Sequence, residues 1–244
     1  MLKDMHRIAE RIDAILFDYG NTLIEFGPEQ VDSCDRALSA ELTTMFGPHD
    51  FAKLNEIQHR ERRAPYSGEF LENDLVTVTR DLIRALFDVE ATTQQLEHLL
   101  DVRFHAMTSA VAVESSVQQL LEELHDRYRL GLISNYPCAR SINHSLAQHH
   151  LNQWFEVIVV SGDVGRVKPH PLIFEQAVMA MQLDPQRTLF VGDNWLGDIQ
   201  GAKRCGMKAV WTKQFVPYEK FDAEPDHFDA DFVIEHLDEL RGLL

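Results

Sequence analysis

Short apolar runs that each end in polar residues recur along this chain, and they constrain the fold more than any other feature. The runs lie at residues 15–17, 130–133, 157–160, 188–191, 209–211 and 232–234, and helical segments alternate with them from about residue 111 onward. Strands that alternate with helices are joined by right-handed crossovers and form a parallel sheet. The pattern therefore predicts an α/β protein with a Rossmann-like parallel sheet at its core.

A long segment separates the first run from the second. From about residue 28 to residue 110 there is no clear β-branched strand, and apolar residues recur at helical spacings. Turn-forming residues such as Gly47-Pro48 punctuate this segment. We expect a core of residues 1–25 and 111–244 with an inserted all-helical cap of residues 26–110. One continuous α/β domain with an irregular middle is the alternative.

Charge and cysteine content narrow the classes of partner. The formal net charge of −16 argues against a general nucleic-acid or anionic-membrane surface, because phosphate binding needs clustered Lys and Arg. The three cysteines are widely spaced and fit a reducing compartment better than a disulfide framework. The start at Met1–Arg7 carries charges where a signal peptide needs an apolar core. We expect a cytoplasmic protein, monomer or homodimer, without nucleic-acid or membrane partners.

Four of the runs end in polar residues suited to phosphate and metal chemistry, one of them the run at residues 157–160, which ends at Ser161-Gly162-Asp163. Asp18 follows the first run, Ser134 and Asn135 follow the second, and Asp193 follows the run at residues 188–191. Because parallel strands present their carboxyl ends on one edge, we expect these side chains to converge. Asp18 is a candidate nucleophile or metal ligand, and Asp193 suits Mg²⁺. Taken singly, each residue also fits a helix cap, an ion pair or a turn.

Two further residues are candidates for the same site. Lys168 stands beside Pro169 and Pro171, which restrict the shape of its loop, so it is a candidate phosphate clamp. Asp198 lies five residues after the acid of the 188–191 run. It could bind the metal through water, pair with Lys168 or act only as an acid favoured by a helix dipole. We expect Arg166 to face solvent.

Taken together and in this order, these segments resemble the four motifs of the haloacid dehalogenase-like (HAD) hydrolase superfamily, in its helical-cap (C1-type) phosphatase-like branch. The resemblance covers residues 12–24 and about 117–244. It implies a Mg²⁺-dependent phosphohydrolase that acts on a small phosphorylated metabolite through an aspartyl-phosphate. The implied roles are nucleophile for Asp18, phosphate binding for Ser134, Asn135 and Lys168, and metal binding for Asp18, the Gly20 carbonyl, Asp193 and Asp198.

The chain departs from the superfamily pattern at Gly20, where its phosphatases usually carry a second Asp. That acid protonates the leaving oxygen and then activates water, and Gly20 can do neither. General acid–base help is typically worth about 10²–10⁴ in rate, or roughly 3–5 kcal/mol of barrier. We therefore expect slow or narrow activity, with the largest penalty on alkyl phosphates. His59, Glu61 or Tyr66 of the cap could replace the acid, although each also fits a solvated face.

The departure leaves other functions open. A non-catalytic protein that binds a metal and a phosphorylated ligand is one alternative, and a dehalogenase or phosphonate hydrolase is another. Phosphonate cleavage in this superfamily uses a cap lysine, and the cap contains only Lys53. The basic stretch with Arg60, Arg62 and Arg63 predicts a contact with an anionic group of the substrate, or else a solvated helix end. The sequence does not determine the substrate.

Overall fold

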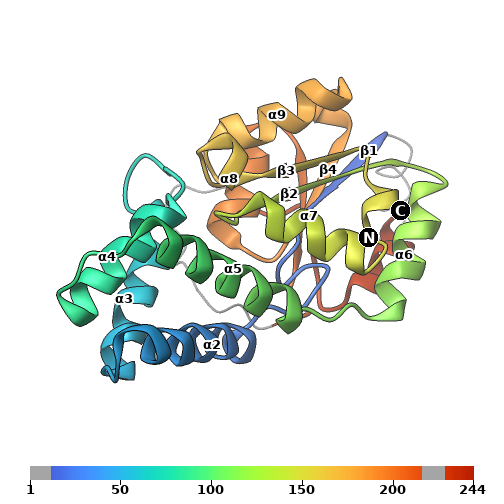
Figure 1. Ribbon diagram of the computed structural model, residues 1–244. Coiled ribbons are helices and arrows are strands. Elements are labelled where there is room, and N and C mark those ends of the chain that lie inside the picture. Colours follow the sequence, from blue (N-terminus) through green and yellow to red (C-terminus); the bar gives the residue numbers. More distant parts are fainter. Residues whose placement is uncertain (1–11, 216–228) are drawn as a thin grey trace.

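The computed structural model describes residues 12–215 and 229–244, whose strands form one six-stranded parallel sheet (Figure 1). The start of the chain at Met1–Arg7 lies outside the described residues. The strand order is β3 (Val157–Val160), β2 (Arg129–Ser134), β1 (Ala14–Phe17), β4 (Thr188–Gly192), β5 (Lys208–Thr212) and β6 (Phe232–Ile234). Each predicted apolar run lies in one of these strands, which confirms the predicted parallel α/β sheet.

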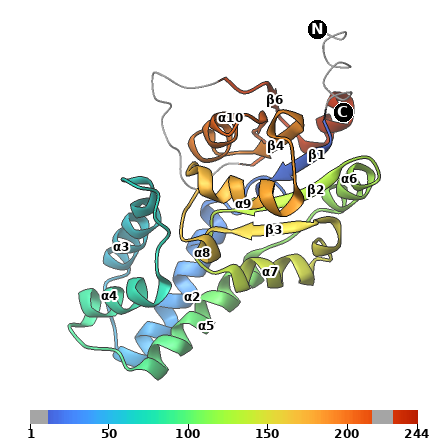
Figure 2. The same cartoon turned by 90° about the horizontal axis from the view of Figure 1, so that it is seen from above.

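Apolar residues on both faces explain why the strands read as continuous apolar runs. Successive side chains of a strand point to opposite faces, so Ile15 and Phe17 pack on one side and Leu16 on the other. Figure 2 shows the sheet between two helical layers. Helices α6 (Ser115–His125) and α7 (Ala139–Gln148) cover one face, and α9 (Pro171–Met181) and α10 (Gly201–Arg204) cover the other.

Residues 28–110 fold into a helical insert that contributes no strand to the sheet. Its helices are α2 (Pro28–Phe46), α3 (Phe51–Arg63), α4 (Leu75–Phe87) and α5 (Thr93–Ala110). They enclose an apolar core of their own that includes Leu38, Leu42, Leu82 and Leu99. The strands point their carboxyl ends toward this insert in Figure 2, so it stands beside the edge where the candidate residues were expected.

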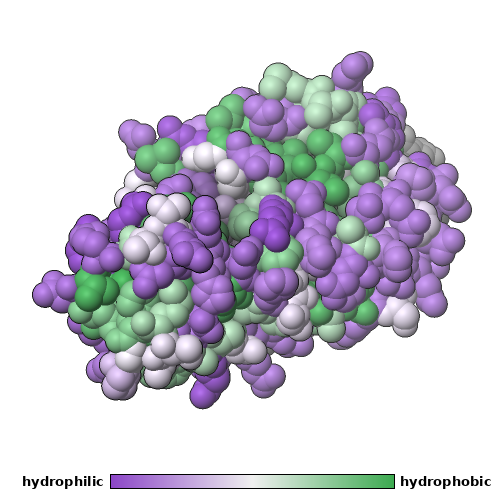
Figure 3. All heavy atoms as spheres, in the orientation of Figure 1, coloured by the Kyte–Doolittle hydropathy of each residue, from purple (hydrophilic) through white to green (hydrophobic). Residues whose placement is uncertain are grey.

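Short helical turns complete the connections between these elements. They are η1 (Ala64–Tyr66), η2 (Asn152–Trp154), α8 (Ser161–Val164), η3 (Pro185–Arg187), η4 (Trp195–Gln200), η5 (Leu237–Glu239) and α11 (Leu240–Leu243). Figure 3 shows a mostly hydrophilic face, with apolar side chains gathered between α7 and α9, where the edge strand β3 lies. None of the described helices is both long and apolar enough to cross a membrane.

Candidate active site

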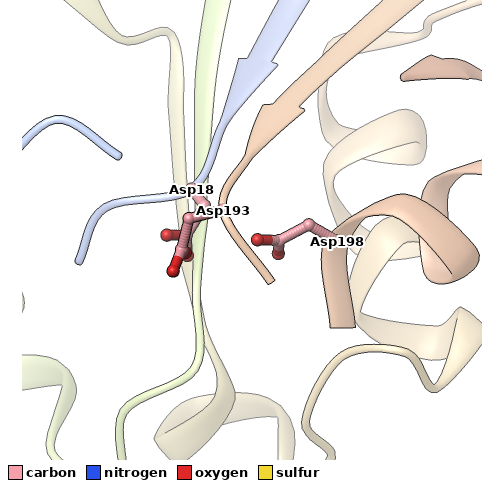
Figure 4. A group of neighbouring side chains, drawn as sticks. All are labelled: Asp18, Asp193 and Asp198. Carbon is pink, nitrogen blue, oxygen red and sulfur yellow. The ribbon is translucent and has the colours of Figure 1, made fainter. Parts of the chain in front are cut away.

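Three carboxylates meet at the carboxyl edge of the sheet. Asp18 directly follows β1, Asp193 directly follows β4, and Asp198 lies in η4. The strands are in register here, and the backbone N–H of Asp18 donates to the carbonyl of Val191 at 2.9 Å. One carboxylate oxygen from each acid lies within 4.8 Å of the others. In Figure 4, Asp18 and Asp193 lie side by side and the carboxylate of Asp198 points toward them.

Lys168 connects two of these acids. Its Nζ lies 2.6 Å from Asp18 Oδ1 and 2.7 Å from Asp198 Oδ1, and it donates to the Ile133 carbonyl at 2.8 Å. The side chain is only 2% exposed. Burial alone would lower the pKa of Lys168, but the two carboxylates outweigh burial and the net direction is upward. The ammonium therefore stays charged, and Asp198 takes the pairing with Lys168 that was one of its predicted roles.

A π-helical turn presents Asp198 to this lysine. The Asn194 side chain accepts a hydrogen bond from the backbone of Gly197 at 2.8 Å, and the backbone N–H of Asn194 donates to Asp198 Oδ2 at 2.9 Å. Gly192 leaves the space that Asp198 occupies, because a Cβ at Gly192 would lie 2.3 Å from Asp198 Oδ2. The sequence Gly192-Asp193-Asn194 thus shapes the turn as well as supplying an acid.

The donor set fits a hard divalent cation. Three carboxylates surround one ammonium, so the cluster carries an excess of negative charge. Burial, together with the charges of Asp18 and Asp198, raises the pKa of Asp193, and burial raises the pKa of Asp198 to about 6. Three close carboxylates beside a single ammonium repel one another when all are ionised, and a further cation would relieve this repulsion. Mg²⁺ prefers carboxylate and other oxygen ligands of this kind.

The two polar residues after β2 have different surroundings. Ser134 is buried, 4% exposed, and lines the same pocket as Asp18. The Asn135 side chain instead holds the backbone of Lys168, accepting from its N–H at 2.7 Å and donating to its carbonyl at 3.1 Å. It also donates to the Tyr66 hydroxyl at 3.1 Å. The geometry therefore favours a positioning role for the Asn135 amide over direct contact with phosphate.

The helical insert closes over this edge through its 69–72 segment, which was not identified from the sequence. The carbonyl of Phe70 accepts from the backbone of Val167 at 2.9 Å, and the N–H of Glu72 donates to Gly165 at 3.1 Å. The Glu72 carboxylate accepts a short hydrogen bond from the hydroxyl of Ser161. Burial raises the pKa of Glu72. These contacts bind the insert to the loop that leads into Lys168.

That segment also corrects the expectation for Arg166. Its side chain is 26% exposed, and its guanidinium donates to the Glu69 carbonyl at 2.8 Å. Arg166 is therefore partly exposed and at the same time contacts the insert. The sequence around position 166 could not predict this contact, because Glu69 lies 97 residues away in the chain.

A cavity of about 320 Å³ extends from the strand ends into the insert. Among the proposed substitutes for the missing acid, Glu61 and Tyr66 line it, whereas His59 is exposed and lies outside its wall. Burial raises the pKa of Tyr66, so its phenol keeps the proton at neutral pH. Lys53 donates to the Ala85 carbonyl at 2.5 Å and does not line the cavity.

Of the three arginines in the basic stretch, the structure brings one to the cavity. Arg62 lines the wall and pairs with Asp35. Arg60 is 68% exposed and is not part of the cavity wall, although it pairs at 3.3 Å with Glu61, which is. Arg63 also lies outside the cavity wall.

The fold is a parallel α/β sheet with a helical insert, and three carboxylates and one buried lysine meet at its carboxyl edge. The family model of haloacid dehalogenase-like hydrolases matches residues 15–212, and the chain belongs to that family. The family resemblance inferred from the four motifs is thereby confirmed.

Known relatives are phosphatases. The chain is 26% identical to the pyrophosphatase PpaX of Anoxybacillus flavithermus, over 96% of this chain and 97% of that protein. It is 40% identical to the glyceraldehyde 3-phosphate phosphatase of Pyrococcus furiosus over 94 residues. That match spans only 38% of either protein, and a second such phosphatase, from Pyrococcus abyssi, is matched over 36% of its length.

Solved structures agree on the fold. A 2-haloacid dehalogenase from Pseudomonas syringae superposes with a TM-score of 0.71 at 24% identity, covering 95% of this chain and 97% of that one. The magnesium-bound HAD hydrolase YfnB of Bacillus subtilis superposes with a TM-score of 0.70 at 20% identity, covering 96% and 99%. At these identities the likeness shows a common fold.

Proposed function

We propose that this protein is a Mg²⁺-dependent phosphohydrolase that acts on a small phosphorylated metabolite through an aspartyl-phosphate intermediate on Asp18. The observation that carries the proposal is the convergence of Asp18, Lys168, Asp193 and Asp198 at one edge of the sheet. The phosphatase activity of relatives that share the family supports it. Positioning and charge neutralisation are most of what phosphoryl transfer requires from a protein.

The residues would divide the work as follows. An Asp18 oxygen attacks phosphorus, forming the Asp18 O–P bond as the bond from phosphorus to the leaving oxygen breaks and its electron pair departs with the leaving group. Lys168 orients Asp18 and neutralises charge on the phosphoryl group, and Ser134 donates to a phosphoryl oxygen. Water then attacks phosphorus, which releases phosphate and regenerates the carboxylate. Asp18, Asp193 and the Gly20 carbonyl would hold Mg²⁺, which supplies electrostatic stabilisation of the phosphoryl oxygens.

Gly20 limits which leaving groups depart readily. An alkoxide needs a proton as it leaves, and position 20 has no side chain to supply one. A phosphate or carboxylate leaving group departs as a stable anion and needs no such proton. We therefore propose that acyl phosphates and phosphoanhydrides are hydrolysed faster than simple alkyl phosphates.

The test is phosphate release with Mg²⁺ from a panel that contains acetyl phosphate, pyrophosphate and alkyl phosphates. Asp18→Ala is expected to abolish release. The control is Asp126→Ala, which changes an exposed acid between α6 and the amino end of β2, and it is expected to leave release unchanged. Phosphate release that survives Asp18→Ala refutes the proposal.

A second candidate function is motivated by the same glycine. A protein that binds Mg²⁺ and a phosphorylated ligand without turnover needs the acidic cluster and Lys168 but no acid at position 20. Ligand-induced thermal stabilisation without phosphate release from any panel member would favour this function.

A further inference from the structure

The insert wall of the cavity contains a polar cluster that the proposed chemistry does not use. It comprises Asp35 of α2, Gln58 and Arg62 of α3, and Arg103 of α5, and all four line the same cavity as Asp18 and Lys168. We call this group the arginine cluster. Asp35 and Gln58 are each only 4% exposed. Charged and polar groups at such depth require a physical explanation.

Hydrogen bonds fix the geometry of the arginine cluster. Arg62 pairs with the Asp35 carboxylate, and Gln58 Nε2 donates to the same carboxylate oxygen at 3.2 Å. The guanidinium of Arg103 donates from Nη2 to Gln58 Oε1 at 3.1 Å. The amide of Gln58 therefore stands between Asp35 and Arg103 and orients both.

The arginine cluster has more positive than negative charge. Its two guanidinium groups share one carboxylate, and that carboxylate pairs with Arg62. Arg103 donates to a neutral amide, that of Gln58, and among the described residues its buried Nε has no hydrogen-bond partner. Burial lowers the pKa of Arg103 to about 10. A buried cation in this condition is stabilised when an anion binds beside it.

The arginine cluster lies near the loop that carries the proposed phosphate-binding residues. Tyr136 is two residues beyond Ser134, and the charges of Arg103 and Arg62 both act to lower the pKa of Tyr136, against the larger effect of burial. Tyr136 lines the cavity as well. The same cavity therefore contains Asp18 and Lys168 at the strand ends and, on the insert side, Arg103, whose positive charge is not balanced by a carboxylate of its own.

We propose that Arg103, oriented by Gln58 and accompanied by Arg62, binds a second anionic group of the substrate on the leaving-group side. This inference rests on the proposed phosphohydrolase function and deepens it. The substrate class is a small phosphate compound that also carries a carboxylate or a second phosphate. A guanidinium suits either group, because its planar donors match both oxygen pairs.

The experiment compares substrates that differ only in the second anion. Carboxyalkyl phosphates of several chain lengths are measured beside alkyl phosphates of matched length whose chains carry no charge, for the wild type and for Arg103→Met. We expect Arg103→Met to lower kcat/KM by about 10- to 100-fold on compounds with the second anion, and by less than about threefold on the others. Arg103→Lys keeps the charge and should recover part of the loss. Arg60→Met, at an arginine outside the cavity, is the matched control.

A binding measurement separates failure of this inference from failure of the proposed function. In Asp18→Asn protein with Mg²⁺, the same compounds are titrated and the shift in thermal unfolding is recorded. If no compound releases phosphate but binding of the carboxylated ligands depends on Arg103, the phosphohydrolase proposal fails and the anion site stands. If Arg103→Met weakens both ligand classes equally, or if the second anion gives no advantage to the wild type, the anion site is refuted. Should Arg103→Met not fold, Arg103→Gln replaces it.

Discussion

Substitution of Gly20 by Asp is the sharpest test of how this site handles leaving groups. The structure has room for the change, because a Cβ at Gly20 would meet its nearest heavy atom, Phe26 Cβ, at 3.7 Å, an ordinary contact. Gly20 is not among the residues with positive φ, so an L-amino acid is compatible with its backbone. Position 20 lines the same cavity as Asp18 and Asp193. The new carboxyl would therefore reach the reaction centre without displacing the backbone.

The expected gain follows from proton transfer. A positioned acid is worth about 10²–10⁴ in rate, which corresponds to roughly 3–5 kcal/mol of barrier. We expect Gly20→Asp to raise kcat/KM for ethyl phosphate within that range and to change kcat/KM for acetyl phosphate by less than about threefold, because kcat/KM reports the step in which the leaving group departs. The later attack of water on the aspartyl-phosphate is common to both substrates and affects kcat alike. The variant also adds a carboxylate to an acidic cluster, so its Tm without Mg²⁺ should fall. Both rates are measured by phosphate release at saturating Mg²⁺.

Gly20→Asn is the matched control, because it has nearly the same shape as Asp but no ionisable group. An equal gain from Asn would show that side-chain packing, rather than proton transfer, limits the wild type. Equal gains in kcat/KM on both substrates would also refute the reasoning, since acetate needs no proton to leave. If Asp changes neither rate, another group already performs the transfer, or the site does not catalyse this reaction.

Three further predictions concern the same site. Burial raises the pKa of Asp198 from 3.8 to about 6. The stability that protonated Asp198 contributes is therefore complete below about pH 4 and is lost as pH rises through 6. The increase in Tm caused by Mg²⁺ should accordingly grow from pH 5 to pH 7.5 in thermal scans. Gly192→Ala forces a Cβ to within 2.3 Å of Asp198 and should lower the free energy of unfolding by about 2 kcal/mol or more, measured in urea. The control is Gly68→Ala, whose Cβ would have nothing within 4 Å, and it should change the free energy of unfolding by less than about 0.5 kcal/mol. Asn135→Ala removes both side-chain hydrogen bonds to the Lys168 backbone. It should lower kcat/KM for phosphate release at least about tenfold and lower the free energy of unfolding in urea by roughly 1–3 kcal/mol.

The sheet and its acidic edge could be predicted because their signals are local. A run such as Val157–Val160 followed by small polar residues indicates a buried strand and its end without reference to the rest of the chain. Parallel pairing then brings all such ends to one edge, whatever their separation in sequence. The end of α2 was readable for the same reason: the helix ends at Phe46 and is followed by Gly47, whose φ of 99° lies in the region that favours glycine.

On the insert side, Glu61, Tyr66 and Arg62 were named from the sequence and line the cavity, but the remaining contacts could not be predicted, because they join residues that have no local signal. Arg103 lies in a helix with several other charges, and its contact with Gln58 spans 45 residues. Glu72 lies in an irregular stretch, and its contact with Ser161 spans 89 residues. Only the packing of α3 against its neighbours distinguishes Arg62 from the exposed Arg60. Periodicity indicates which face of a helix is buried, but it does not show which polar side chain faces a cavity.

The contacts of the 69–72 segment link substrate enclosure to the position of the central lysine. The segment bonds to Gly165 and Val167, and the next residue in the chain is Lys168. Asn135 holds the Lys168 backbone from the other side and also contacts Tyr66 of the insert. A movement of the insert away from the sheet would therefore release two of the constraints on Lys168 at once. The contacts of the ammonium itself, to Ile133, Asp18 and Asp198, all come from the core. The insert therefore acts on the backbone around Lys168, and a ligand that bridges the arginine cluster and the strand ends would preserve those backbone contacts.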